Sequence, residues 1–139
     1  MSGVLLLDTH AAIWLMADQS LSTNAVDAIQ TARGKGEPIH VSPISAWEIG
    51  LLVARGRINL NTKPESWFDR LLEAPGIVLA DMSPDVLIGS SFLPDSHRLR
   101  DPADRILVAT AREYGHRLVT RDRILLGYAA DGHIQAVDC

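Results

Sequence analysis

The sequence of 139 residues contains a single cysteine, Cys139, so an internal disulfide bond is not possible. It has no apolar run near the ~18 residues that a membrane span requires, and no basic segment followed by a long apolar one near its start. We therefore expect a protein of a reducing compartment, located in the cytoplasm and without a membrane partner.

Basic residues are not in excess. Thirteen Lys and Arg stand against 17 Asp and Glu, a net charge of −4, whereas nucleic-acid binding favours basic surface. Setting aside the four acids assigned below to one site leaves 17 − 4 = 13 acids against 13 basic residues. The charge balance weakens a nucleic-acid function without excluding it.

The composition that remains, 47% hydrophobic and 22% charged, is that of an ordinary globular protein. A chain of this length buries roughly two-thirds of its unfolded surface around one core. We expect residues 1–139 to form a single domain.

Short apolar runs alternate with helical patterns along the whole chain. The runs predict strands over 4–7, 39–42, 77–80, 117–120 and 134–137. Helices are predicted over 10–18, with Thr9 as its N-cap, and over 22–33, 44–55, 63–72, 83–92 and 103–114, with a polar loop over 94–100. This alternation predicts an α/β fold, a parallel sheet with helices on both faces and right-handed crossovers.

Four acidic residues fall at the carboxyl ends of these predicted strands. Asp8 ends the first strand, Glu48 lies early in the helix after the second, Asp104 lies in the first turn of the helix over 103–114, and Asp122 follows the fourth strand. Each alone is explained by a helix cap, a helix dipole or a turn. Together they would place four like charges at one edge of the sheet, the edge where α/β sheets bind ligands.

Such a cluster needs protons or cations. Two carboxylates ~4 Å apart repel by about 4 kcal/mol at an effective dielectric constant near 20. Carboxylate ligands without His or Cys favour a hard divalent ion, so Mg²⁺ or Mn²⁺ is the expected cofactor. Carboxylate-held Mg²⁺ commonly meets its substrate through phosphate oxygens, which points to phosphodiester hydrolysis.

The same residues, in this order, resemble the PIN-domain ribonucleases, and among them the VapC toxins of bacterial toxin–antitoxin pairs. Four blocks carry the resemblance over nearly the whole chain: 6–10 (LLDTH), 42–49 (SPISAWEI), 97–105 (HRLRDPADR) and 118–122 (LVTRD). The resemblance implies a PIN-like three-layer fold with a central five-stranded parallel sheet, and a metal-dependent endoribonuclease acting on structured RNA such as tRNA or rRNA. It also implies a homodimer, and a VapB-type antitoxin that covers the site and forms higher-order complexes.

By position in these blocks, Asp8, Glu48, Asp104 and Asp122 are the acidic quartet. Asp8 and Asp104 would hold the metal most directly; Glu48 and Asp122 would bind through water, hold a second ion or orient the nucleophile. Additional candidates for the site are Asp101, Thr9 and Thr120. Asp101 precedes Pro102 and is the natural N-cap of its helix, which leaves Asp104 to face the crevice.

Several arginines flank these acids, and four of them are candidates for contacts to RNA phosphates: Arg98, Arg100, Arg105 and Arg121. Ion pairing with neighbouring acids explains any one of them equally well. For the other arginine pair, Arg55 and Arg57, we favour helix C-terminal charges over RNA contacts. The tryptophans are expected to be core or interface anchors, and Trp14 and Trp47 could line a groove for an antitoxin helix.

Two other functions fit parts of the pattern. A haloacid-dehalogenase-like phosphatase also places an Asp after its first strand, but it requires a second Asp two residues later, where this chain has His10. A PIN-fold scaffold could bind RNA or protein without cleaving it, and the intact quartet argues against that alternative.

Overall fold

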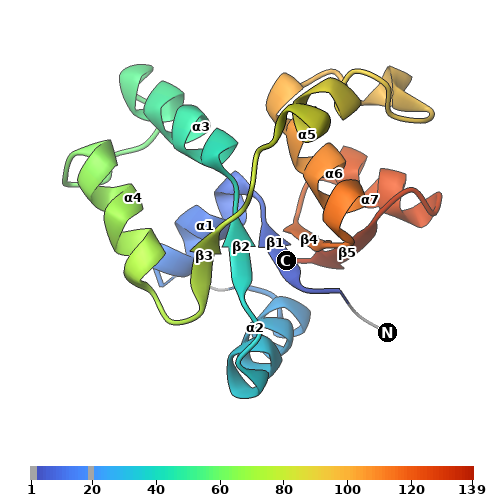
Figure 1. Cartoon of the computed structure of the whole chain (residues 1–139). Helices are drawn as coiled ribbons and strands as arrows, with labels where there is room; N and C mark the ends of the chain where they lie inside the picture. Colours follow the sequence, from blue (N-terminus) through green and yellow to red (C-terminus); the bar gives the residue numbers. More distant parts are fainter. Residues whose placement is uncertain (1–2, 19–20) are drawn as a thin grey trace.

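The computed structural model describes residues 3–18 and 21–139. Five strands form one parallel sheet in the order β3-β2-β1-β4-β5, with bounds β1 Leu5–Leu7, β2 Ile39–Val41, β3 Ile77–Leu79, β4 Arg117–Thr120 and β5 Gln135–Asp138 (Figure 1). All five predicted strands are present, with ends shifted by at most a residue or two. The apolar run next to the start of the chain is the central strand, as its burial on both faces requires.

The helices are α1 Thr9–Met16, α2 Thr23–Lys35, α3 Pro43–Ala54, α4 Pro64–Glu73, α5 Pro84–Gly89, α6 Pro102–Tyr114 and α7 Arg123–Ala130. A single 3-10 turn, η1, covers Ser96–Arg98 within the predicted polar loop. Two errors of the helix prediction are larger than a shift of two residues at a helix end. Helix α5 ends at Gly89, short of residue 92, and α7 was not predicted at all.

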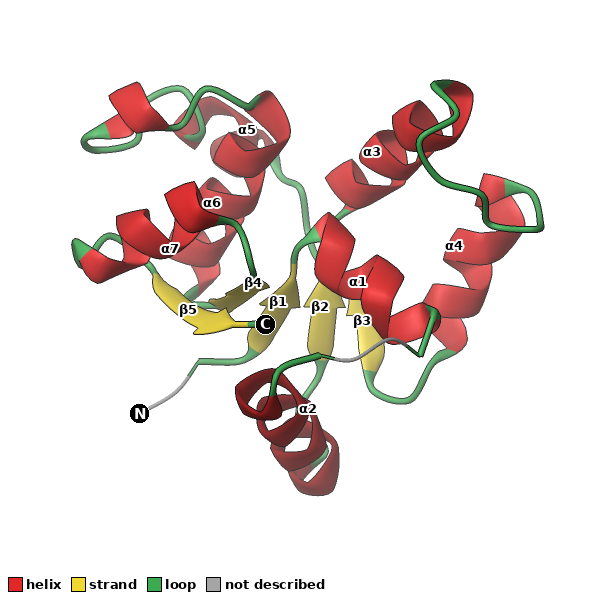
Figure 2. Cartoon of the chain, turned by 180° about the vertical axis from the view of Figure 1, so that it is seen from behind, coloured by secondary structure: helices red, strands yellow, loops and turns green. Residues whose placement is uncertain are grey.

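Side chains of each strand alternate between two separate cores. Leu5 and Leu7 of β1 pack with residues of α1, α2 and α4 on one face of the sheet. Leu6, the residue between them in the sequence, is fully buried on the other face and packs with residues of α5, α6 and α7. Figures 1 and 2 show these two helical layers on opposite faces of the sheet. The fold is therefore the expected three-layer α/β/α sandwich.

Helix α3 lies at the carboxyl edge of the sheet and contacts both layers. It packs against α1, α4 and α6, and it contributes Ile49 to one core and Ile44 to the periphery of the other. Helix α6 also begins at this edge, since its C-terminal end leads through Gly115 into β4, which starts at the opposite edge of the sheet. The N-terminal turns of α1, α3, α6 and α7 thus meet at one edge.

Gly115 shows why a glycine is needed between α6 and β4. Its φ of 70° is left-handed, and its carbonyl oxygen lies 1.9 Å from where a Cβ on Gly3 would stand. The chain before β1 therefore passes directly against this turn.

None of the helices within the described residues combines the length and the apolar content of a membrane span.

Candidate active site

The four predicted acids line one open cavity of about 360 Å³ at the carboxyl edge of the sheet. They come from the end of β1, from α3, from the first turn of α6 and from the loop after β4. The structure places three further candidates in the same lining and adds three residues that we had not assigned to the site; the complete set is Asp8, Thr9, His10, Trp14, Glu48, Asp101, Asp104, Leu107, Arg121 and Asp122.

Asp8 is held by the helix that follows it. Its Oδ1 accepts a hydrogen bond from the backbone N–H of Ala11 at 2.8 Å, so Asp8, and not Thr9 as predicted, is the N-cap of α1. The helix begins one residue earlier than predicted, and the Asp8 carboxylate satisfies the free N–H of its third residue, Ala11. Asp8 is only 7% exposed, and this burial raises its pKa, while a hydrogen bond with the Thr120 side chain opposes the rise.

Glu48 is oriented by the residue after Asp8. The Thr9 hydroxyl donates a short hydrogen bond to Glu48 Oε1, and it lies 2.9 Å from Ser45 Oγ. Since Thr9 has one hydroxyl proton and gives it to the carboxylate, Ser45 donates to Thr9. Ser45 is fully buried one turn before Glu48 on α3, and we had not singled it out, although a serine at i−3 from an acid shares its helix face.

Asp101 and Asp104 take different positions at the start of α6. Asp101 is the N-cap, and its Oδ1 accepts from the N–H groups of Ala103 at 2.8 Å and Asp104 at 3.2 Å. The Asp104 side chain faces the cavity. Burial first, and then the negative charges of neighbouring acids, raise its pKa to about 7; these acids are Asp101, Asp122, Glu48 and Asp8. The pKa of Asp104 therefore depends on the charge of each of the other four acids around the cavity.

Asp122 is the N-cap of the unpredicted helix α7. Its Oδ1 accepts from the N–H groups of Ile124 at 2.8 Å and Leu125 at 3.1 Å, and its own N–H donates to Thr120 Oγ1 at 3.0 Å. Thr120 is fully buried, so its hydroxyl fixes both Asp8 and the backbone of Asp122. The helix could have been found from the cap itself, followed by apolar residues at 124, 125 and 128.

Of the four candidate arginines, only Arg121 lines the cavity. Its guanidinium lies 4.0 Å from the centroid of the Trp14 ring, and Nη2 donates to the Cys139 carbonyl at 2.6 Å. Arg100 is exposed on the loop before α6.

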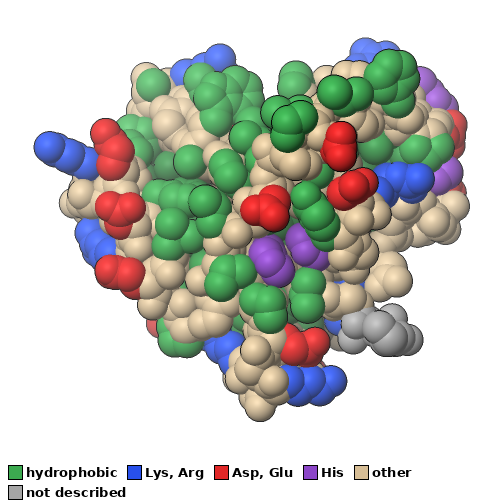
Figure 3. Space-filling model, viewed as in Figure 1, with side chains coloured by type: hydrophobic (Ala, Val, Ile, Leu, Met, Phe, Trp, Pro, Cys, Tyr) green, Lys and Arg blue, Asp and Glu red, His purple; other side chains and the backbone are tan. Residues whose placement is uncertain are grey.

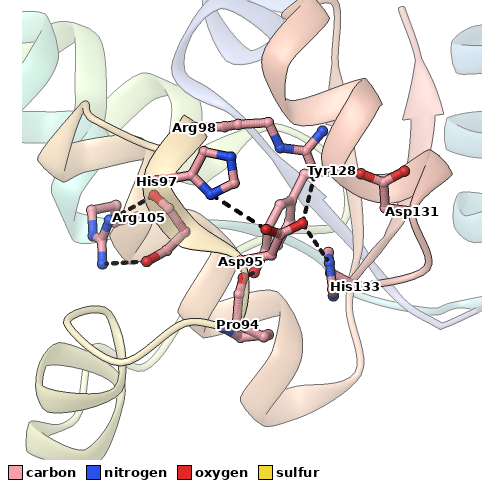
Figure 4. Close-up of polar contacts among 9 residues, drawn as sticks. Pro94, Asp95, His97, Arg98, Arg105, Tyr128, Asp131 and His133 are labelled. Atoms are coloured by element: carbon pink, nitrogen blue, oxygen red, sulfur yellow. Dashed lines mark hydrogen bonds and ion pairs between the residues drawn. The ribbon is translucent and has the colours of Figure 1, made fainter.

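The other two arginines organise the loop before α6. Arg105 donates to the carbonyls of Ser90 at 2.8 Å, Ser96 at 3.2 Å and Leu99 at 2.7 Å. Arg98 pairs with Asp95 at 3.5 Å and with Asp131 after α7. Figure 4 shows Asp95 at the centre of these contacts, facing His97, His133 and Arg98. We assign both arginines to holding this loop.

The donor atoms around the cavity fit a hard divalent cation in type and in charge. Five carboxylates surround it, and burial together with mutual repulsion raises the pKa of Glu48 and Asp104, so a bound cation would relieve an electrostatic cost. Within residues 3–18 and 21–139, however, no three His, Cys, Asp or Glu side chains already converge on a common metal position. The carboxylates would have to close around an ion.

Comparison with known proteins places this geometry in context. The protein-family model of the PIN domain matches residues 5–130 of the sequence. The chain is 40% identical over 121 residues to ribonuclease VapC22 of Mycobacterium tuberculosis, which covers 86% of this chain and 88% of the relative. Solved structures with a similar fold include VapBC2 from Rickettsia felis bound to a DNA fragment from their promoter, with a TM-score of 0.69, 14% identity, and 97% and 99% of the two chains covered. A toxin–antitoxin complex from Klebsiella pneumoniae matches with a TM-score of 0.60, 20% identity and 93% of each chain.

Proposed function

Since the chain belongs to the PIN-domain family and, within it, to the VapC ribonucleases, we propose that it is a toxin that cleaves structured RNA, such as tRNA or rRNA, with the help of Mg²⁺ or Mn²⁺. The observation that carries this proposal is the cavity in which acids from four distant segments meet. Their combined negative charge is what a divalent cation would offset, and the bound cation would in turn attract the negatively charged phosphodiester.

In this proposal Asp8 and Asp104 hold the cation most directly, with Glu48 and Asp122 beside them. The bound ion would lower the pKa of the attacking water and stabilise the charge that develops on the phosphorus oxygens. Glu48, whose orientation is fixed by Thr9, orients the water for attack. Asp8 and Asp122 cap helices through Oδ1, so a second carboxylate oxygen of each can serve the site.

Two arginines are kept as phosphate contacts. Arg121 lines the cavity beside Asp122, and Arg100 is exposed on the loop next to Asp101. Thr120 supports the site by holding Asp8 and Asp122, and Asp101 contributes by capping α6.

The partners in this proposal are a second copy of the chain and a VapB-type antitoxin. Two copies of the chain form a homodimer, and the antitoxin joins them in higher-order complexes in the cytoplasm. Structural neighbours that were solved as toxin–antitoxin complexes support an antitoxin partner. The antitoxin would inhibit by covering the acidic cavity.

The test is cleavage of total cellular RNA by the purified protein, freed of antitoxin, with Mg²⁺ or Mn²⁺. Discrete fragments should appear, and Asp8→Asn and EDTA should each lower the rate about 100-fold or more. Asn retains an N-cap for α1, so this variant should stay folded. Asp85→Asn, at an exposed acid in the first turn of α5, is the matched control and should cleave normally.

Cleavage that survives in Asp8→Asn would contradict the assignment of the cavity. Intact RNA with a folded wild-type protein that binds Mg²⁺ would favour the non-cleaving scaffold.

A further inference from the structure

A second groove of about 400 Å³ adjoins the acidic cavity. The two share His10, Glu48 and Asp101, so the groove opens directly onto the acids. From there it follows the outer side of α3, past Trp47, to Arg55 and Arg57. A ligand lying in this groove would have one end at the acids and the other at two guanidinium groups.

Trp47 is 52% exposed, so it is not a core residue, and the expectation that it anchors an interface stays a prediction. The other two tryptophans are engaged within the fold, since Trp67 is 8% exposed and Trp14 lies under Arg121. Trp47 stands next to Glu48 in the chain, so its indole is one residue away from an acid of the proposed site. An exposed indole at this place offers a flat apolar surface beside the reacting centre.

Arg55 and Arg57 lie at the C-terminal end of α3, and both are exposed. Position 55 is eight residues after Trp47, or about 12 Å along a helix at 1.5 Å per residue. Figure 3 shows basic side chains along the upper edge of the part of the molecule that holds α3. On a chain with net charge −4, this pair of exposed arginines is a local concentration of positive charge next to an exposed indole.

We propose that this groove binds a single-stranded segment of the RNA substrate, with one base stacked on Trp47 and backbone phosphates paired with Arg55 and Arg57. An aromatic platform next to basic side chains is how proteins bind unpaired nucleic acid. In an A-form duplex the base faces are stacked on one another, so Trp47 selects an unpaired base, as in a loop or bulge. The inference rests on the proposed function, because it places the same substrate at the same acids.

An antitoxin helix could also cover an exposed tryptophan. The two arginines favour RNA, since the groove offers positive charge where a phosphate backbone leaving the acids would pass. The experiment below separates the two occupants.

The first measurement is the affinity for a fluorescein-labelled single-stranded RNA of about 12 nucleotides, followed by anisotropy in EDTA so that no cleavage occurs. Trp47→Ala should raise Kd about 5- to 100-fold, the range of one lost stacking contact, and Trp47→Phe should restore most of the affinity. The double variant Arg55→Gln/Arg57→Gln should reduce the slope of log K against log salt by about 1.4, the value for two phosphates on a single strand.

Matched controls lie elsewhere on the surface. Phe92→Ala removes an aromatic ring that is 80% exposed, and Lys35→Gln/Arg70→Gln removes two exposed charges. Phe92→Ala should leave Kd unchanged, and Lys35→Gln/Arg70→Gln should leave the salt slope unchanged. A fully paired RNA should bind wild type and Trp47→Ala equally.

Unchanged affinity of Trp47→Ala for the single strand would overturn the proposal. The proposal would also be overturned if Trp47→Ala lowered the affinity for the antitoxin but not for RNA, because the groove would then be a protein-docking surface. Failure of the proposed function is a separate result. If the protein binds RNA through Trp47 but never cleaves it, the RNA-binding groove is supported and the nuclease function is contradicted. In a cleaving protein, Trp47→Ala should raise KM and leave kcat near its wild-type value.

Discussion

Replacing Asp104 by Asn should make the metal-free protein more stable near pH 8 while inactivating the proposed site. The pKa of Asp104 in the fold is raised from 3.8 to about 7, first by burial and then by the charges of four neighbouring acids. The folded state therefore binds the Asp104 proton more tightly than the unfolded state. Stability that depends on this group falls as the pH rises through the interval between the two values, and the loss is complete above it.

The structure sets the size of the effect. At about 1.4 kcal/mol for each pKa unit, the rise from 3.8 to about 7 corresponds to an upper bound of about 4 kcal/mol. Partial exposure of the side chain and screening by salt reduce this to an expected gain of about 1–3 kcal/mol for the Asn variant. Near pH 5 the folded Asp104 is still neutral but the unfolded chain, with a pKa of 3.8, has already ionised it, so only about a third of the gain should be present.

The assay is urea unfolding in EDTA near pH 5 and near pH 8, which compares wild type with Asp104→Asn. Asp85→Asn is the matched control, because Asp85 also lies in the first turn of a helix that begins with proline but stands outside the cavity. Added Mg²⁺ should stabilise the wild type near pH 8 more than Asp104→Asn. A gain of equal size at both pH values, or no gain near pH 8, would refute the electrostatic reasoning.

Three further predictions concern the supports of the site. Thr9→Val removes the hydroxyl that orients Glu48 and should lower kcat about 10-fold or more, with little change in RNA affinity, measured by single-turnover cleavage. Arg105→Gln removes the hydrogen bonds from Arg105 to three loop carbonyls, of which Ser96 keeps the Leu99 N–H as a donor, and should cost about 1–3 kcal/mol in urea unfolding, against no loss for the exposed Arg70→Gln. Gly3→Ala should lower the thermal midpoint, because its Cβ would stand 1.9 Å from the Gly115 carbonyl; an unchanged midpoint would show that the chain moves aside freely.

The sheet and the cluster of acids could be predicted from the sequence because both depend on chain direction. A run such as Leu5–Leu7 must be buried on both faces, and residues that follow parallel strands must reach the same edge. The same reasoning distinguished Asp101, the cap, from Asp104, which faces the cavity, because Pro102 marks the start of α6.

Side-chain exposure on α3 could not be predicted. The helix is apolar on most sides, since it contacts α1, α4 and α6, and no periodic pattern tells which side is left open at Trp47. Helix α7 was missed because Asp122 was interpreted only as a site acid or a turn residue, although one carboxylate can also cap a helix. The link from Ser45 through Thr9 to Glu48 depends on how α1 and α3 meet, which spacing within either helix does not reveal.

The double use of Asp8, Asp101 and Asp122 as helix caps has a consequence for how this protein can lose its activity. Most substitutions at these positions remove both a charge and a cap, so an inactivated chain would also tend to be degraded. Asparagine, serine and threonine are the exceptions, because they remove the charge and still cap a helix, as Ser22, Ser42 and Ser83 do in this chain. Under selection for loss of activity, we therefore expect either unstable chains or replacements of these acids by Asn, Ser or Thr, and only the second kind would persist as a folded protein.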